Sequence, residues 1–312
     1  MGYIIEVEGL TKKFKDFTAV NSINLKIKEG EIFGFLGPNG AGKTTTISML
    51  TTLLTPTSGK ARIGGYDLHT DGVMIRNIIG VVPQNFALFP ELTASENLAY
   101  IGKLYGLTDK EIRERSERLL KTVDLYDAKD RIAGIFSGGM KQRLSLAASI
   151  ISHPQILFMD EPTTGLDPQS RIAMRELTRQ LNKEGMTIIY TTHDMDEADK
   201  ICDRISIMDK GRIIAEGTSA HLKEMISTSH VVEVEIEQCP PGLAQELKKL
   251  PFIRSVDCEA GLININVDRK AGVFYHLSDF FHRRNLKVEE IRFKEHTLED
   301  VFIQLTNSNL RD

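Results

Sequence analysis

The sequence of 312 residues has no excess of positive charge: 43 Asp and Glu outnumber 39 Lys and Arg, and the formal net charge is -4. No bulk attraction to nucleic acid or to an anionic membrane is therefore expected, and a nucleic-acid partner is disfavoured. The composition, 41% hydrophobic and 26% charged, is typical of a globular protein and argues against disorder. The length suits two domains, at ~150 residues per domain.

Cysteines and long apolar runs are also scarce. Cys202, Cys239 and Cys258 are scattered and lack CxxC spacing, so the pattern predicts buried or incidental thiols rather than a metal or redox site. No run approaches the ~18 apolar residues of a membrane-spanning helix. The N-terminal segment "MGYIIEVEGL" lacks the basic start and apolar core of a signal peptide. These absences predict a cytosolic chain that reaches a membrane only through another protein.

The strongest motif that is present is "GPNGAGKTT" (37–45). It follows a nearly continuous apolar run, typical of a strand buried on both faces, and precedes a helical pattern. In this context the pattern G-x-x-x-x-G-K-[ST] predicts a nucleoside triphosphate site. Backbone amides would wrap the β-phosphate, Lys43 would reach the β and γ oxygens, and the Thr44 hydroxyl would ligate Mg²⁺. The predicted cradle is Gly37, Pro38, Asn39, Gly40, Ala41, Gly42, Lys43, Thr44 and Thr45.

Polar side chains also end three other apolar runs. Asp160 closes "QILFMD", where an acid can hold Mg²⁺ through water, and Glu161 exits on the opposite face, toward a water beside the γ-phosphate. Gln84 and His193 stand at the edge where α/β proteins bind ligands. Gln84 could complete Mg²⁺ coordination, and His193 could donate to the γ-phosphate. A lone Gln or His is more often a loop residue and paired acids are often turn residues, so the prediction depends on the set.

A second turn with phosphate-binding features lies at "FSGGMKQRL" (136–144). Ser137 can cap the helix that follows, and Gly138 and Gly139 let backbone amides approach an anion at its positive N-terminus. One chain with one apparent nucleotide site therefore carries two phosphate-binding turns.

This ordered set of motifs, together with the loop "TGLD" (164–167), resembles the ATP-binding cassette (ABC) ATPases over about residues 1–220. The resemblance implies an α/β fold of the P-loop NTPase type, with a mixed-sheet core, an antiparallel β-subdomain and a helical subdomain at about 85–150. It implies ATP and Mg²⁺ as cofactors, with Thr44, Gln84 and Asp160 at the metal. Glu161 would be the general base and His193 the γ-phosphate sensor.

The resemblance also answers the question of the second turn. In this family Ser137, Gly138 and Gly139 would face the γ-phosphate held by the other subunit of a head-to-tail dimer, with Asp167 among the nucleotide-binding residues. Phe14 would stack on adenine, with Phe17 as its rival and core burial as the alternative for both. The common signature LSGGQ is FSGGM here, which leaves the phosphate-facing residues intact.

The chain beyond the cassette changes in character. We expect a linker at 221–230 and an accessory α+β domain at 231–312, whose short strands and helices suit a ferredoxin-like fold. Its last segment, "TLEDVFIQLT" (297–306), resembles the closing motif of ATPases that serve ABC-2-type exporters, such as the daunorubicin-resistance ATPases. A capping box at Thr297 and Asp300 begins this helix, and its apolar stripe is expected to dock into its own domain.

The resemblance implies a peripheral subunit at the cytoplasmic face of the cell membrane. Its partners would be an ABC-2-type permease on a separate chain and a second ATPase, identical or related. The exported substrate would be a drug, antibiotic, lipid-like or polyketide-like compound. In this family a coupling helix of the permease docks after the glutamine loop, the loop that contains Gln84. The segment that follows it here, "FALFPELT" (86–93), is apolar, although core packing of Phe86 and Phe89 is as plausible.

Three other functions fit the sequence less well. ATPases of translation usually fuse two cassettes and those of DNA repair insert coiled coils or zinc motifs, whereas this chain has one cassette and neither insertion. A nucleotide kinase would explain the phosphate loop but neither the "SGG" signature nor His193. An importer ATPase is disfavoured by the C-terminal motif.

Overall fold

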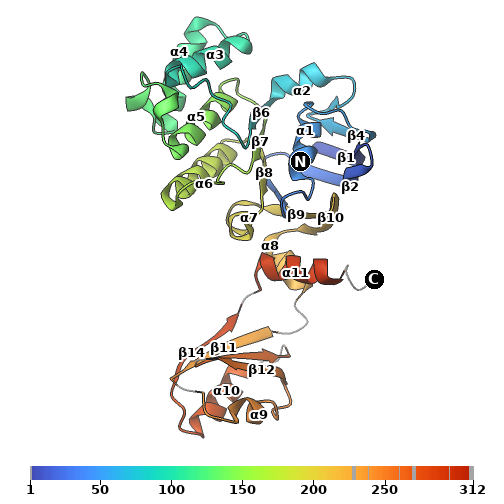
Figure 1. The fold of residues 1–312 in the computed structure, drawn as a ribbon, viewed down its shortest axis with the longest axis vertical. Coiled ribbons are helices and arrows are strands. Elements are labelled where there is room, and N and C mark those ends of the chain that lie inside the picture. Colours follow the sequence, from blue (N-terminus) through green and yellow to red (C-terminus); the bar gives the residue numbers. More distant parts are fainter. Residues whose placement is uncertain are drawn as a thin grey trace. The chain divides into compact units, whose positions relative to one another are not determined.

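The protein is described by a computed structural model that covers residues 2–226, 230–237, 239–259, 261–268, 272–294 and 296–308. The chain forms two compact units, Met1–Ser219 and Ala220–Asp312. The helices and strands of both units are labelled in Figure 1.

The first unit combines strands and helices. Its strands are β1 (Tyr3–Phe14), β2 (Phe17–Lys28), β3 (Ile32–Leu36), β4 (Ser58–Ile63), β5 (Tyr66–Asp67), β6 (Ile79–Val82), β7 (Ile156–Asp160), β8 (Thr187–Thr192), β9 (Arg204–Asp209) and β10 (Arg212–Gly217). Its helices are α1 (Lys43–Leu50), α2 (Gly72–Ile78), α3 (Ala94–Leu104), α4 (Asp109–Thr122), α5 (Gly138–Ile150), α6 (Pro168–Lys183) and α7 (Met195–Ile201), with 3-10 turns at Tyr126–Ala128 and Ala133–Ile135.

An antiparallel sheet with the order β2-β1-β4-β5 forms one side of this unit. Its strands alternate: Ile23, Leu25 and Ile27 of β2 are buried, and the residues between them are exposed. This is the pattern of a sheet with one face on the core and the other in solvent. The buried residues pack with α1 and with one face of the central sheet.

The central sheet has the order β10-β9-β3-β8-β7-β6, and all its strands except β10 run parallel. Every residue of β3, β7 and β8 is buried; the apolar runs of β3 and β7 predict this, whereas β8 also contains three threonines. Because the strands are parallel, the residues that follow β3, β6, β7 and β8 meet at one edge. The expected α/β fold with a mixed-sheet core is confirmed.

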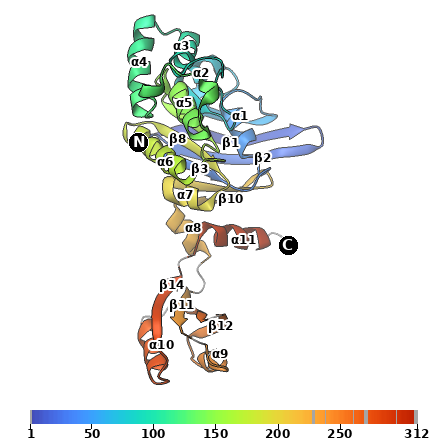
Figure 2. The ribbon, with the colours of Figure 1, turned by 60° about the vertical axis from the view of Figure 1, so that its left-hand side comes forward.

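A helical arm of α3, α4 and α5 lies between β6 and β7 in sequence. Figures 1 and 2 show it gathered on the side of the unit away from the antiparallel sheet. Capping boxes start two of its helices, where Thr93 pairs with Glu96 and Thr108 with Glu111. These boxes satisfy amides that the first turn of a helix leaves without partners. The arm packs its apolar residues against the second face of the central sheet.

The second unit contains α8 (Ser219–Met225), β11 (His230–Ile236), α9 (Leu243–Leu247), β12 (Ile253–Glu259), β13 (Leu262–Val267), α10 (Val273–His282), β14 (Val288–Lys294) and α11 (Leu298–Ser308). Its antiparallel sheet has the order β12-β13-β11-β14, and α9 and α10 supply the core of one face. This βαββαβ arrangement is the ferredoxin-like topology expected from the sequence. Figures 1 and 2 show α8 and α11 side by side, and their Leu222, Leu298 and Val301 are buried.

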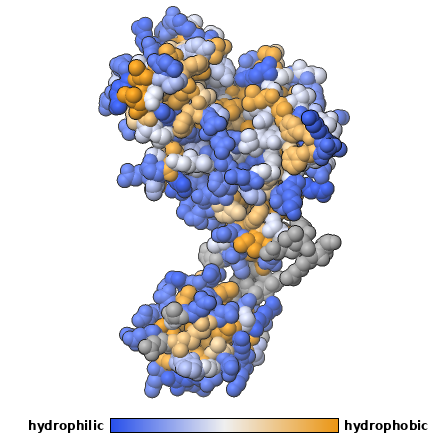
Figure 3. Space-filling view, viewed as in Figure 1, coloured by the Kyte–Doolittle hydropathy of each residue, from blue (hydrophilic) through white to orange (hydrophobic). Residues whose placement is uncertain are grey.

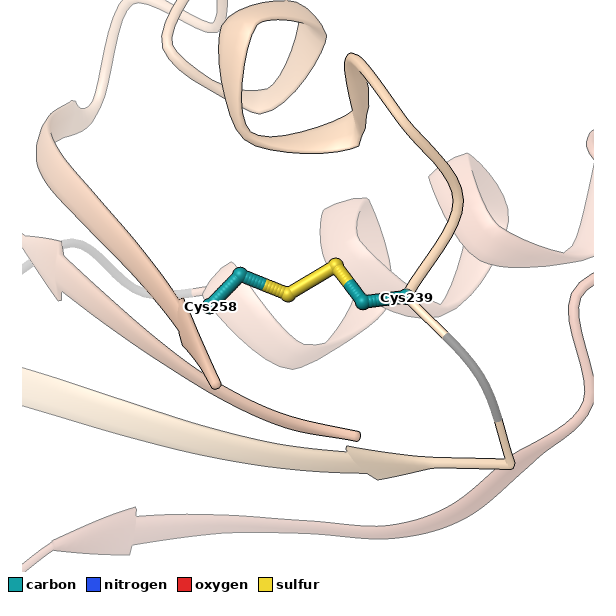
Figure 4. Close-up of a disulfide and its surroundings, with 2 residues drawn as sticks. All are labelled: Cys239 and Cys258. Atoms are coloured by element: carbon teal, nitrogen blue, oxygen red, sulfur yellow. A yellow bond between two sulfur atoms is a disulfide. The ribbon is translucent and has the colours of Figure 1, made fainter. Parts of the chain in front are cut away.

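The cysteine prediction is wrong for two of the three residues. Cys239, between β11 and α9, forms a disulfide with Cys258 of β12 (Figure 4), and Cys202 is a free thiol. Sequence spacing missed the pair because the two residues are 19 positions apart and meet only when β12 returns after α9. The disulfide closes a loop around α9. Within the residues that the structure describes, no helix is long and apolar enough to cross a bilayer.

We expect mild oxidation of the purified chain to consume two thiols and leave one. The product should be a monomer whose mass spectrum contains a peptide linked between Cys239 and Cys258. Closing a loop of this size contributes about 3 kcal/mol to the stability of the second unit, so its hydrogen-exchange protection should fall on reduction. The same measurement on Cys202→Ser provides the control. Intermolecular dimers, or linkage of Cys202, would show that the pair does not meet in this way.

Candidate functional site

The phosphate loop connects β3 to α1. Its Gly42 has φ +106°, and a Cβ there would lie 2.6 Å from the carbonyl oxygen of Ala19, so no residue with a side chain fits. Lys43 is buried, and its Nζ donates to the carbonyl oxygens of Gly37 at 2.8 Å and Pro38 at 3.1 Å. The loop thus holds the lysine ammonium inside its own turn, at the N-terminus of a helix.

The two acids at the end of β7 lie beside this loop. The hydroxyl of Thr44 donates to Oδ1 of Asp160 at 3.2 Å, and Lys43 Nζ lies 3.4 Å from Oε1 of Glu161. Both carboxylates are buried. Two segments more than a hundred residues apart in sequence are therefore joined by one hydrogen bond and one ion pair.

The carboxylate of Glu161 also contacts the predicted site residues Gln84 and His193. Its Oε2 is 3.4 Å from Nε2 of Gln84, which follows β6, and 3.2 Å from Nδ1 of His193, which follows β8. Oε2 further accepts a hydrogen bond of 3.2 Å from the hydroxyl of Thr164. The structure therefore brings Lys43, Gln84, Glu161 and His193 together, as the strand ends predict.

The backbone of Glu161 is strained, and its charge is stabilised. Its φ of +48° lies in the left-handed region, which costs a non-glycine residue on the order of 1–3 kcal/mol. Desolvation acts to raise the pKa of Glu161, but the hydrogen bond with His193 and the charge of Lys43 outweigh it and lower that pKa. Glu161 is therefore held as a carboxylate, the form that can accept a proton.

A cavity of about 310 Å³ opens over these residues. Gly37, Pro38, Ala41 and the predicted stacking residue Phe14 are not in its lining, whereas the rival Phe17 is. Phe14 pairs with Phe17 across the β1–β2 turn, and Lys12 lies over its ring. The lining residues are Phe17, Ala19, Asn39, Gly40, Gly42, Lys43, Thr44, Thr45, Gln84 and Glu161.

The second phosphate-type turn lies outside this lining. Ser137 caps α5 by accepting from the amide of Met140, and a Cβ on Gly139 would lie 2.2 Å from the hydroxyl of Ser170. Asp167 caps α6 by accepting from the amide and hydroxyl of Ser170, and these bonds lower the pKa of Asp167. The N-termini of α5 and α6 are thus packed together, with Ser137 exposed.

Sequence patterns missed two hydroxyls at the site. Thr164 lies in the "TGLD" loop, whose pattern assigns it no role, and no pattern points to Thr191 of β8. Thr191 is fully buried; it donates to Asp160 Oδ1 at 2.6 Å and accepts from the Glu161 amide at 3.0 Å. The signal for both is weak, because a threonine inside an apolar strand is ordinary.

Comparison with known proteins agrees with this geometry. Residues 20–164 match the family described as ABC transporter. The chain is 39% identical to the linearmycin resistance ATP-binding protein LnrL of Bacillus subtilis (strain 168), over 99% of this chain and 100% of that protein. The chain belongs to the ABC transporter ATPases. It is also 38% identical to the daunorubicin/doxorubicin resistance protein DrrA of Streptomyces peucetius, over 97% of this chain and 92% of that protein.

Solved ABC cassettes share the fold. The structure of cbiO1 from Clostridium perfringens superposes with a TM-score of 0.65 at 33% identity, over 70% of this chain and 89% of that one. A dimeric cassette bound to ADP and Pi gives 0.63 at 30% identity, over 69% of this chain and 98% of that one. This ABC transporter ATPase therefore binds and hydrolyses ATP.

The cavity lining predicts which aromatic residue contacts adenine. Base–aromatic stacking contributes about 1–3 kcal/mol, so Phe17→Ala should weaken ATP binding by that amount without changing the chemical step. Phe14→Ala, the matched control one residue before the turn, should have a smaller effect. Titration with a fluorescent ATP analogue measures both. The opposite ranking would assign the stacking to Phe14, as the sequence resemblance implies.

Proposed function

We propose that Glu161 is the general base of ATP hydrolysis in this ABC ATPase. The observation that carries the proposal is the convergence of Lys43, Gln84 and His193 on one buried, ionised carboxylate. In the nucleotide complex Lys43 would exchange Glu161 for phosphate oxygens, which frees the carboxylate to accept a proton from water. Gln84 would orient that water, and His193 would donate to the γ-phosphate.

The same edge of the sheet suits Mg²⁺. Thr44, Gln84 and Asp160 offer a hydroxyl, an amide carbonyl and a carboxylate, and these hard oxygen donors are what this ion prefers. Thr44 already contacts Asp160, so these two donor groups lie within reach of one another, and Gln84 lines the same cavity as Thr44. When bound, the ion would neutralise charge on the β- and γ-phosphates.

We further propose that the active form is a head-to-tail dimer, of two copies or of this chain with a related ATPase. Ser137 and Gly138 are exposed at the N-terminus of α5 but do not line the cavity of their own chain. A helix N-terminus with a capping hydroxyl is suited to a phosphate group. This turn, backed by Asp167 and Ser170, would complete the site of the facing subunit.

The partner would be an ABC-2-type permease on a separate chain, which places this subunit at the cytoplasmic face of the membrane. A second cavity of about 330 Å³ lies beside the helical arm, where apolar residues reach the surface of the first unit (Figure 3). It is lined mainly by apolar side chains, including the exposed Leu53, Leu104 and Tyr105, and by Ala87 after the glutamine loop. A coupling helix of the permease would dock there.

The relatives favour export of an antibiotic or lipid-like compound. They include the resistance proteins above and the Nod factor export ATP-binding protein I of Ralstonia nicotianae, 36% identical over 99% of this chain and 95% of that protein. We propose that residues 1–220 are the ATPase domain and 231–312 an accessory domain, joined at 221–230. Part of that joint is helical, since α8 runs to Met225.

Replacing the base should separate nucleotide binding from turnover. Glu161→Gln keeps the size and the hydrogen-bonding capacity of the side chain but cannot accept the proton. We expect Mg-ATP binding to persist, hydrolysis to fall by about 10²–10⁴-fold, and an ATP-dependent dimer to accumulate. Steady-state ATPase assays and light scattering measure the two effects. Normal hydrolysis by this variant would remove Glu161 from its role.

Two further changes test the shared site in the Glu161→Gln background. Ser137→Ala should reduce the dimer and leave ATP binding to the monomer intact. Lys43→Ala should weaken nucleotide binding itself, because it removes the cation that the phosphates contact. A dimer that forms equally well without the Ser137 hydroxyl would argue against the head-to-tail arrangement.

Docking at the second cavity predicts that a charge on its rim disrupts the transporter. Leu104→Glu should abolish copurification in detergent with a coexpressed ABC-2-type permease, because it places a carboxylate in an apolar contact. The ATPase activity of the isolated subunit should be unchanged. Tyr275→Glu, at an exposed aromatic of α10, is the matched control. Retention of the permease by Leu104→Glu would place its docking site elsewhere.

A further inference from the structure

A single buried hydroxyl connects the two acids of the site. Thr191 lies on β8, in register with Asp160 of the neighbouring β7. Its Oγ1 donates to Asp160 Oδ1 at 2.6 Å and accepts from the backbone amide of Glu161 at 3.0 Å. One side chain therefore contacts the carboxylate of the first acid and the backbone of the second.

We propose that Thr191 is a positioning residue that orients Asp160 toward Mg²⁺ and fixes the backbone from which Glu161 projects. The inference rests on the proposed Mg-ATP hydrolysis, and it deepens that proposal by adding a residue that touches neither nucleotide nor metal.

The orientation of Asp160 is the stronger effect. Oδ1 accepts from two hydroxyls, Thr191 at 2.6 Å and Thr44 at 3.2 Å, and these fix the rotation of the carboxylate. If Thr44 turns to the metal, Thr191 becomes the remaining hydroxyl that holds Oδ1. The Thr191 hydroxyl is itself fixed by two hydrogen bonds, one donated to Oδ1 and one accepted from the Glu161 amide, so it holds Oδ1 in one direction.

The effect on Glu161 is on its backbone. Glu161 adopts a left-handed φ of +48°, and its amide donates both to the hydroxyl of Thr191 and, at 3.2 Å, to the carbonyl oxygen of Thr191. Loss of the hydroxyl leaves the second bond, so the amide keeps a partner. A variant without the hydroxyl is therefore expected to fold.

The test replaces the hydroxyl with a methyl group of similar size. Outer-shell partners of a metal ligand typically change metal affinity or activity by 10–100-fold, so we expect Thr191→Val to lower kcat by about that factor. It should also weaken nucleotide binding in MgCl₂ and leave binding in EDTA unchanged. Thr191→Ser, which retains the hydroxyl, should restore both properties.

Thr187 gives a matched control on the same strand. It is also fully buried, and its hydroxyl accepts from the amide of Gly30 at the other end of β8. Thr187→Val removes one buried hydroxyl at comparable structural cost, and its kcat and Mg²⁺ dependence should match those of the unmodified chain. Equal losses in Thr187→Val and Thr191→Val, or failure of Thr191→Ser to rescue, would reduce Thr191 to a packing residue and overturn the proposal.

The two proposals fail separately. The Mg²⁺ dependence of nucleotide affinity reports on the metal site at Asp160 and is the same whichever residue acts as the base. It therefore tests the role of Thr191 independently of Glu161. Wild-type turnover in Glu161→Gln would overturn the proposed base and leave that measurement intact. An unchanged Mg²⁺ dependence in Thr191→Val would overturn the positioning role even where Glu161 is the base.

Discussion

The buried ion pair between Lys43 and Glu161 is the constraint on which the site depends. Their side chains are only 4% and 6% exposed, and each charge would be costly to bury without the other. The carbonyls of Gly37 and Pro38 satisfy two more lysine hydrogens. The pair ties the phosphate loop to the end of β7 and holds Glu161 ionised. The same lysine is the one that phosphates would attract, so nucleotide binding must rearrange this contact.

The pair can form because of the order of strands in the central sheet. β3 neighbours β8, and β8 neighbours β7, so the loop after β3 and the acids after β7 meet at one edge although far apart in sequence. β6 and β8 bring Gln84 and His193 to that same edge. Each of these strands is largely apolar and is followed by one or two polar residues at its carboxyl end, and the parallel arrangement brings those residues together.

The sequence predicted what depends on local pattern and missed what depends on register. Apolar runs that end in polar residues predicted the strands and the four converging side chains. Each of these runs can be recognised within its own short segment of sequence. The bond from Thr191 to Asp160 required knowing which residues of β7 and β8 are paired. The resemblance favours Phe14 as the stacking residue, whereas the fold places Phe17, its partner across the β1–β2 turn, in the cavity lining. The disulfide depended on the return of β12 after α9, which spacing does not encode.

The departures from the common signature fall where they leave the phosphate-type turn unchanged. Phe136 is buried in the core of the arm, and Met140 packs partly against that core. Phe136 and Met140, which stand where the common signature has Leu and Gln, therefore change the packing around α5. Ser137 and Gly138 stay exposed at the N-terminus of that helix. Gly139 is different, because Ser170 occupies the space that a side chain would need. This contact fixes the N-terminus of α5 against the capped start of α6, so the turn is presented by two helices rather than by a mobile loop.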